Sequence, residues 1–311
     1  MAKKEISFNF PRPVDNDFFV GHAGVIASFF GAWKKRDEYP IHPVWLLTGP
    51  RGIGKATLAY RLARRIFSDL YNRPESEIAA QISVGGIGDL FVVDLEHNIS
   101  DNKAAKSISI EAVRAMIEKM QLFSMGESWR VVIIDSMDEL STFAPNALLK
   151  VLEEPPAKTL FFVIAHSLDR VLPTIRSRSR VEKMRPLSGL EICEIAAKLL
   201  PGRALSPDII KVSGGSFGRI AAMLSTGADG LFDEVVRVCK NPASNSADCL
   251  LLAKKIAANP ENMPILMDVV AYFGLAELYP IALRDIERAN VLHLDMDTTA
   301  YKIINAILQC L

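Results

Sequence analysis

Short unbroken apolar runs alternate with helical patterns through roughly the first 185 residues. The apolar runs lie at residues 44–47, 90–93, 131–134 and 160–164. Runs without polar alternation are typical of strands covered on both faces, as in a parallel sheet between layers of helices. Helical periodicity fits residues 55–69, 110–121 and 145–154, and Pro155-Pro156 end the last of these, because proline cannot donate a helical hydrogen bond. The pattern predicts an α/β core with right-handed crossovers.

Beyond Pro186 the strand signals fade and helical periodicity takes over. It fits residues 188–200, 206–212 and 218–224, and the polar, glycine-containing stretch at residues 225–230 is typical of a linker. Further helical segments follow, separated by Asn-Pro pairs and a proline at residues 241–242, 259–260 and 280. We therefore predict three domains: an α/β domain at residues 1–185, a small helical domain at 186–229 and an all-helical domain at 230–311.

Composition excludes several classes of protein. Lys plus Arg and Asp plus Glu each number 36, so no net charge draws the chain to nucleic acid or to an anionic membrane. No secretory apolar stretch follows Met1–Glu5, and Asp268 and Glu277 interrupt the apolar segment near residues 264–283. We expect a cytoplasmic protein with no membrane partner. The four cysteines, all at or beyond Cys193, show no CxxC spacing and predict buried free thiols and no metal site.

The most informative segment reads Gly-Pro-Arg-Gly-Ile-Gly-Lys-Ala-Thr at residues 49–57, between an expected strand and an expected helix. Glycines such as Gly49, Gly52 and Gly54 let backbone N–H groups approach phosphate oxygens, and Lys55 would reach the outer phosphates. This pattern predicts a P-loop. The hydroxyl that would bind Mg²⁺ directly after the lysine is replaced by Ala56, and Thr57 stands one residue late. A neighbouring helical residue points about 100° away, so magnesium binding should be weakened.

A second motif is an apolar strand that ends in a carboxylate at Asp135. Asp135 stands where a Walker B aspartate would hold Mg²⁺ through water. The next position, which in hydrolytic proteins carries a Glu that activates the attacking water, is Ser136, a poor substitute base. Asp138 and Glu139 follow closely and are alternatives for that base, although we expect them to serve in solvation and helix capping instead. We expect severely impaired hydrolysis.

Two further segments carry a resemblance to a known family. Residues 146–156 read Asn-Ala-Leu-Leu-Lys-Val-Leu-Glu-Glu-Pro-Pro, and residues 173–179 read Pro-Thr-Ile-Arg-Ser-Arg-Ser. Together with their spacing, they closely resemble bacterial clamp-loader subunits, which are AAA+ proteins, over about residues 20–225. Within that family the alternatives are the ATP-hydrolysing gamma/tau type and the delta-prime type. Residues 49–59 and the altered Walker B motif resemble the delta-prime type.

The resemblance implies an AAA+ core, a helical lid and an all-helical C-terminal collar domain. It implies that Arg178 is an arginine finger, whose permanent planar charge would stabilise the γ-phosphate of ATP bound to a neighbouring subunit. The alternative is that Arg178, between Arg176 and Arg180, is part of a solvated basic face. The family's Ser-Arg-Cys motif reads Ser177-Arg178-Ser179 here. Arg219 matches the family's sensor 2 position, facing nucleotide, although a lid-to-core ion pair is an equal alternative. His166, in the sensor 1 region, is expected to be a structural hydrogen-bonding residue.

Function follows from the resemblance as an expectation. The chain would be the stator of a hetero-oligomeric DNA polymerase III clamp loader in DNA replication, beside gamma/tau and delta subunits, with the sliding β clamp and primer-template DNA bound through the complex. ATP or ADP would be a passive ligand, with little Mg²⁺ binding and no ATPase activity of the chain's own. No zinc is expected, because the four-cysteine module of many relatives is missing before Cys193. The alternatives are an autonomous DNA-stimulated ATPase of gamma/tau type and a free-standing nucleic-acid-binding module, which the lack of a basic stripe disfavours.

Overall fold

A computed structural model describes residues 10–95, 107–122, 128–225 and 229–240. The chain divides into two compact units, of which one comprises residues 11–199 with 216–218 and the other comprises the remainder. Each unit is described by itself. The expected domain boundaries near residues 185 and 229 stay predictions, and the predicted collar lies outside the described residues beyond Lys240.

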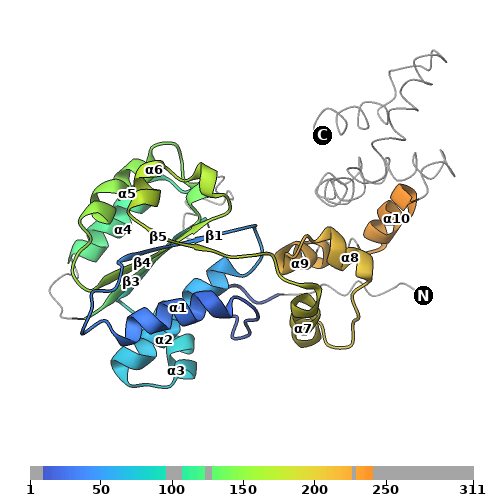
Figure 1. Ribbon diagram of the computed structural model, residues 1–311, viewed down its shortest axis with the longest axis horizontal. Coiled ribbons are helices and arrows are strands. Elements are labelled where there is room, and N and C mark those ends of the chain that lie inside the picture. Colours follow the sequence, from blue (N-terminus) through green and yellow to red (C-terminus); the bar gives the residue numbers. More distant parts are fainter. Residues whose placement is uncertain (1–9, 96–106, 123–127, 226–228, 241–311) are drawn as a thin grey trace, which may run out of the picture. The chain divides into compact units, whose positions relative to one another are not determined.

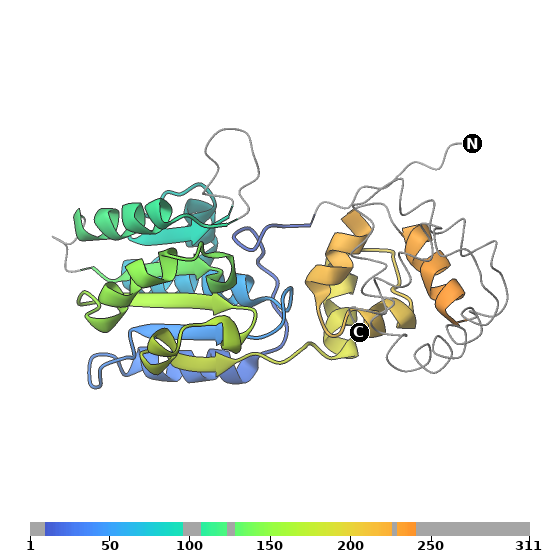
Figure 2. The same cartoon turned by 90° about the horizontal axis from the view of Figure 1, so that it is seen from above.

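The larger unit contains a five-stranded sheet in the order β2-β3-β4-β1-β5. All four strand pairings are parallel, and Figure 2 shows the strands side by side with their arrows pointing the same way. The strands are β1 (Val44–Thr48), β2 (Leu90–Asp94), β3 (Arg130–Asp135), β4 (Thr159–Ala165) and β5 (Arg180–Lys183). The expectation of a parallel α/β sheet is confirmed.

Helices cover both faces of this sheet (Figure 1). One layer holds α1 (Ala23–Lys34), α2 (Lys55–Tyr71) and α3 (Glu75–Ser83), and the other holds α4 (Ile110–Leu122), α5 (Ala144–Glu153) and α6 (Pro173–Ser177). Successive residues of a strand point to opposite faces, so Trp45 and Leu47 of β1 join the core under α1 and α2, whereas Val44 and Leu46 join the core under α4 and α5. This two-sided burial explains the unbroken apolar runs.

The edge strands differ from the central ones. Every residue of β1 and β4 is buried, whereas β2 alternates between buried and partly buried positions and β5 is largely exposed or half-buried. The sequence analysis missed β5, because Arg-Val-Glu-Lys is no apolar run. An edge strand with one solvated side needs no such run.

Within the described residues, four further helices follow the sheet. They are α7 (Gly189–Leu199), α8 (Pro207–Val212), α9 (Phe217–Ser225) and α10 (Asp229–Lys240), close to the predicted helical segments. The predicted linker at residues 225–230 is wrong at its end, because Asp229 and Gly230 already belong to α10. Cys193 of α7 is exposed, contrary to the expected burial. Ile192 and Ala196 form the buried side of α7, and a side chain one position beyond Ile192 is turned about 100° away from it.

Among the described residues, no helix combines the length and apolarity needed to cross a bilayer.

Candidate nucleotide site and arginine finger

Sequence-predicted site residues meet at one edge of the sheet. Residues 49–54 join β1 to α2, Asp135 ends β3, and His166 directly follows β4. The strands β3, β4 and β1 are neighbours and parallel, so their carboxyl ends open onto the same edge. Ligands of open α/β sheets bind at this edge.

Lys55 is folded back onto the loop that precedes it. Its ammonium donates hydrogen bonds to the carbonyl oxygens of Gly49 and Pro50, both at 2.6 Å. The side chain is buried, and burial lowers the pKa of Lys55 from 10.5 to about 8, although the negative charges of Asp135 and Asp138 oppose this shift. The ammonium is therefore poorly solvated and well placed to gain from a phosphate anion.

The loop's next carbonyls are held from the start of α9. Ser216 Oγ donates to the Arg51 carbonyl at 2.8 Å, and the Gly218 N–H donates to the Gly52 carbonyl at 2.9 Å. A Cβ on Gly52 would lie 2.4 Å from Ser216 Oγ, and one on Gly218 would lie 2.6 Å from Gly52 Cα. Both glycines are thus required by close backbone approach. His22 completes the set, since its Nε2 lies 3.3 Å from the Ile53 carbonyl.

This arrangement leaves a cradle of backbone donors. The carbonyls of residues 49–53 accept the hydrogen bonds just described, and the N–H groups of residues 52–54 donate to no acceptor within the described residues. These N–H groups lie immediately before the N-terminus of α2, where the helix dipole also favours an anion. The donor set fits the phosphates of a nucleotide. It does not fit a magnesium ion equally well, because the methyl group of Ala56 offers no ligand.

Asp135 is a poorly solvated carboxyl with other charged groups around it. Burial is the main cause that raises its pKa to about 6, and the negative charges of Glu139 and Asp94 add to the shift, whereas Lys55 and Arg51 oppose it. The carboxyl is therefore largely ionised at pH 7 and would lose its capacity to bind a magnesium ion as the pH falls below about 6.

Ser136 is fully buried, and its Oγ lies 3.4 Å from His166 Nε2. Burial, followed by the charge of Lys55, lowers the pKa of His166 to about 4, so the ring is neutral at pH 7. A buried hydroxyl beside a neutral imidazole resembles a nucleophile with its base, but a side chain with no exposed surface cannot reach a substrate. The pair is structural in this geometry.

Both carboxylates that could replace the missing base have structural partners. Asp138 accepts hydrogen bonds from the backbone N–H groups of His166 and Ser167. Glu139 forms an ion pair with Arg51 at 3.2 Å. Each carboxylate thus holds the loops around the site in place. Neither of them takes the place of the activating Glu.

We expect Asp135→Asn to raise the free energy of unfolding by about 1–3 kcal/mol at neutral pH, because the amide avoids the cost of a buried charge. The pKa of Asp135 is raised on folding, from 3.8 to about 6. The charge therefore destabilises the native state fully above about pH 6, and this cost disappears as the pH falls towards 3.8, where both states hold the proton. Urea titrations across this range measure it. A gain that does not shrink at acid pH would contradict the assignment.

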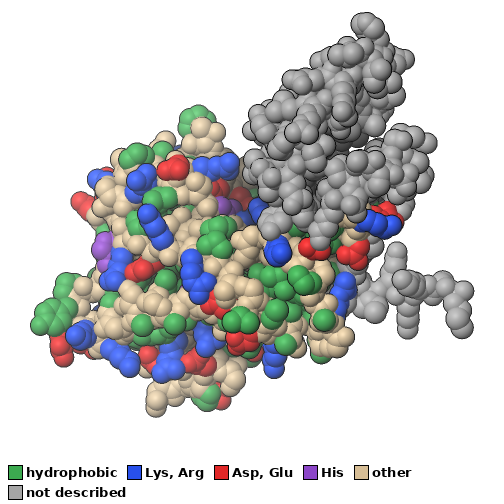
Figure 3. Space-filling view, turned by 45° about the vertical axis from the view of Figure 1, so that its right-hand side comes forward, with side chains coloured by type: hydrophobic (Ala, Val, Ile, Leu, Met, Phe, Trp, Pro, Cys, Tyr) green, Lys and Arg blue, Asp and Glu red, His purple; other side chains and the backbone are tan. Residues whose placement is uncertain are grey.

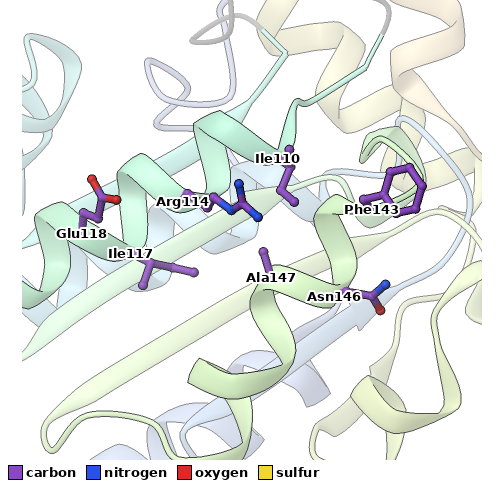
Figure 4. A pocket seen from close by; sticks show the side chains of 7 residues that line it. All are labelled: Ile110, Arg114, Ile117, Glu118, Phe143, Asn146 and Ala147. Atoms are coloured by element: carbon purple, nitrogen blue, oxygen red, sulfur yellow. The ribbon is translucent and has the colours of Figure 1, made fainter.

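Among the described residues of the larger unit, one cavity lies at the site and another lies away from it. One, of about 810 Å³, is lined by Asp135, Glu139 and Arg51 together with Asp94, Lys119 and the loop between α3 and β2. The other is a groove of about 700 Å³ between α4 and α5, to which Phe143, Arg114 and Glu118 contribute (Figure 4). This groove carries no part of the P-loop. Within the described residues, no group of three His, Cys, Asp or Glu side chains could hold a metal ion.

Arg178 directly follows α6, and its contacts differ from those of Arg176 and Arg180. Its Nη2 forms an ion pair with Glu153 Oε1 at 2.8 Å, and its side chain is 37% exposed. Arg180 instead stacks over the ring of Trp45 at 4.4 Å and pairs with Glu182, and Arg176 is exposed. The three arginines therefore do not form one solvated basic face.

Arg219 belongs to α9 but lies in the smaller unit. Its role facing nucleotide, and the alternative lid-to-core ion pair, both stay predictions. Sequence reasoning missed Glu153, His22 and Ser216 as partners of the site. Ser216 carried a signal, because the glycine-rich stretch at residues 213–219 is typical of close backbone packing. Glu153 and His22 carried none, since their partners are distant in the sequence.

The P-loop after β1, the aspartate after β3 and the parallel sheet that joins them define a P-loop protein of the AAA+ class. The family model for "DNA polymerase III, delta subunit" matches residues 34–188. The chain belongs to the DNA polymerase III clamp-loader family.

Two curated relatives agree with this assignment. The chain is 33% identical to DNA polymerase III subunit delta' of Pseudomonas aeruginosa over 183 residues, which cover 55% of this chain and 52% of that protein. It is 30% identical to the gamma subunit of Buchnera aphidicola subsp. Acyrthosiphon pisum over 54% of this chain and 45% of that protein. The chain thus spans about half the length of these curated relatives. A solved gamma-subunit-related protein from Thermotoga maritima is 16% identical, with a TM-score of 0.39 over 89% of this chain and 90% of that one.

Proposed function

We propose that the chain is a delta-prime-type subunit of the DNA polymerase III clamp loader. In this role it binds beside gamma/tau and delta subunits and supports ATP-dependent loading of the sliding β clamp onto primed DNA. Its own contribution is mechanical and electrostatic: it acts as a rigid stator and supplies Arg178 to ATP held by its neighbour.

One observation carries the proposal. The phosphate cradle of residues 49–55 is intact in geometry, while the position next to Asp135 holds a fully buried serine. A protein with a cradle but no activating base can hold a nucleotide and cannot drive water onto it efficiently. The neighbouring carboxylates Asp138 and Glu139 are engaged with other groups, which supports this division.

Nucleotide enters the proposal as a passive ligand. Lys55 and the N–H groups of residues 52–54 would hold the phosphates of ATP or ADP, with little contribution from Mg²⁺ because Ala56 provides no ligand. A bound nucleotide would raise the free energy of unfolding of the chain, because it binds the folded state and not the unfolded state. Arg219 would be the sensor 2 residue that faces the nucleotide.

The second candidate is a catalytically active, DNA-stimulated ATPase of gamma/tau type. Its support is specific: Lys55 and Asp135 are both present, and gamma and gamma/tau subunits are among the relatives at 27–30% identity. The buried Ser136 weighs against it.

A protein that binds nucleic acid by itself needs a basic surface to attract the phosphates. On the coloured part of the face in Figure 3, Lys and Arg side chains are interspersed with Asp and Glu. This supports shared DNA binding through the complex in preference to a free-standing nucleic-acid-binding module.

Omission tests the proposal. A clamp loader reconstituted from this organism's gamma/tau and delta subunits should load the β clamp onto primed DNA at least about tenfold faster with the chain than without it, because an incomplete ring lacks both a structural member and a finger. Co-purification of the chain with these subunits is the control for assembly. Equal loading with and without the chain would reject the function.

A further inference from the structure

The guanidinium of Arg178 is held from two sides. Glu153, the last residue of α5, forms an ion pair in which its Oε1 lies 2.8 Å from Nη2. On the other side Nη1 donates to the Thr174 carbonyl of α6 at 3.0 Å and lies 3.4 Å from Ser177 Oγ. The side chain therefore lies in the corner between α5 and α6, which pack on the same face of the sheet (Figure 1).

This arrangement leaves the group able to receive an anion. Arg178 and Glu153 are 37% and 47% exposed, so the pair faces solvent. A guanidinium has five N–H donors in a fixed plane, and Nε of Arg178 takes part in none of the hydrogen bonds of the described residues. A phosphate oxygen can thus approach without first displacing a partner.

We propose that Glu153 is a positioning residue for the arginine finger Arg178, a role that rests on the proposed function. An arginine side chain has many rotamers, and fixing one of them before the neighbouring subunit docks removes an ordering cost from the step that uses it. Glu153 and the Thr174 carbonyl together select the rotamer that keeps the guanidinium at the α5–α6 corner.

Positioning fits this pair better than restraint does. Exposed ion pairs contribute little free energy, so Glu153 cannot withhold Arg178 from a phosphate group that carries more negative charge than one carboxylate. A weak pair is nevertheless sufficient to bias rotamers, because that requires only a small preference.

The chain offers a matched control in the adjacent carboxylate, Glu154. It is also exposed and follows Glu153 directly, yet it forms no ion pair within the described part of the chain. Loss of one negative charge at this helix end is therefore common to both alanine variants, whereas loss of the contact with Arg178 is specific to Glu153→Ala.

The test is single-turnover ATP hydrolysis in the reconstituted complex, at the site of the subunit next to this chain. Glu153→Ala should lower kcat about three- to tenfold and leave KM for ATP unchanged, because a less well-ordered finger acts on the transition state. Glu153→Gln keeps the acceptor oxygen and should restore at least about half of the wild-type rate. Glu154→Ala should match wild type. Assembly of each variant complex by gel filtration accompanies the kinetics.

Epistasis separates this inference from the function on which it rests. In the Arg178→Ala background, adding Glu153→Ala should change nothing further. If Arg178→Ala slows hydrolysis while Glu153→Ala alone does not, or if Glu153→Ala raises the rate, Glu153 does not position the finger although the proposed function stands. The same follows if Glu153→Ala still slows the reaction without Arg178. If Arg178→Ala has no effect, the finger and this inference fall together.

Discussion

Replacing Arg178 by alanine in the reconstituted clamp loader should lower ATP hydrolysis at the neighbouring subunit's site at least about 100-fold, because an arginine finger is worth about 10³–10⁵ in kcat. The guanidinium has the permanent charge and the exposed face that this role needs. ATP binding should change little, since the charge acts chiefly in the transition state. Pre-steady-state phosphate release, resolved by site, is the measurement.

Arg176→Ala is the matched control for this effect. Arg176 lies two residues away in α6, is exposed, and forms no ion pair among those of the described residues. Its loss should leave hydrolysis and clamp loading near the wild-type level. If the two variants are equally active, or equally impaired, Arg178 has no special role and belongs with the general basic surface.

Lys55→Ala should weaken ADP binding by the isolated chain about 30- to 100-fold, because a buried ammonium contributes charge-assisted hydrogen bonds to phosphate that an alanine cannot replace. The side chain already lies within the loop, where it bonds the carbonyls of Gly49 and Pro50. Isothermal titration measures the affinity. Lys34→Ala, an exposed lysine at the end of α1, should bind like wild type, and unchanged binding by Lys55→Ala would remove the cradle from the account.

Two conditions sharpen this second prediction. The pKa of Lys55 is lowered to about 8, so the ammonium is lost as the pH rises through that value, and wild-type affinity should fall above about pH 8 while that of Lys55→Ala stays level. Replacing Mg²⁺ by a chelator should change the affinity less than about threefold, because Ala56 provides no ligand. Strong magnesium dependence would show that the loop holds a metal after all.

Sequence patterns predicted the centre of the fold better than its edges. The strands β1, β3 and β4 are apolar because helices cover both of their faces. Such strands can be recognised in the sequence from the consecutive apolar residues alone. In contrast, β5 is Arg-Val-Glu-Lys. Its place is set by pairing with β1 and by the stacking of Arg180 on Trp45, which are tertiary contacts that no local pattern encodes.

The candidate site shows the same limit. The P-loop and Walker B motifs led to Lys55 and Asp135, because each follows an apolar strand, whereas the resemblance to clamp-loader subunits led to Arg178. The residues that hold them in place were not predictable in this way. Ser216 bonds to the carbonyl of Arg51, 165 positions away in the sequence. Glu153 at the end of α5 pairs with Arg178, which follows α6. Only the folded chain brings these residues together.

Electrostatic detail also required the structure. Asp135 in the sequence is an ordinary carboxylate after a strand, but burial beside Glu139 and Asp94 raises its pKa to about 6. Ser136 in the sequence is merely a residue other than Glu, whereas its complete burial against His166 shows that it cannot approach a bound nucleotide. The residues that would activate water are therefore less suited to their task than the cradle of residues 49–55 is to binding phosphates.

The most direct test of a cradle without a base is steady-state ATP turnover by the purified chain, with and without primed DNA. The account predicts no turnover above the uncatalysed background in either case, at nucleotide concentrations that saturate binding. Robust turnover that is abolished by Lys55→Ala would contradict it, because a group near Asp135 would then be activating water within this chain.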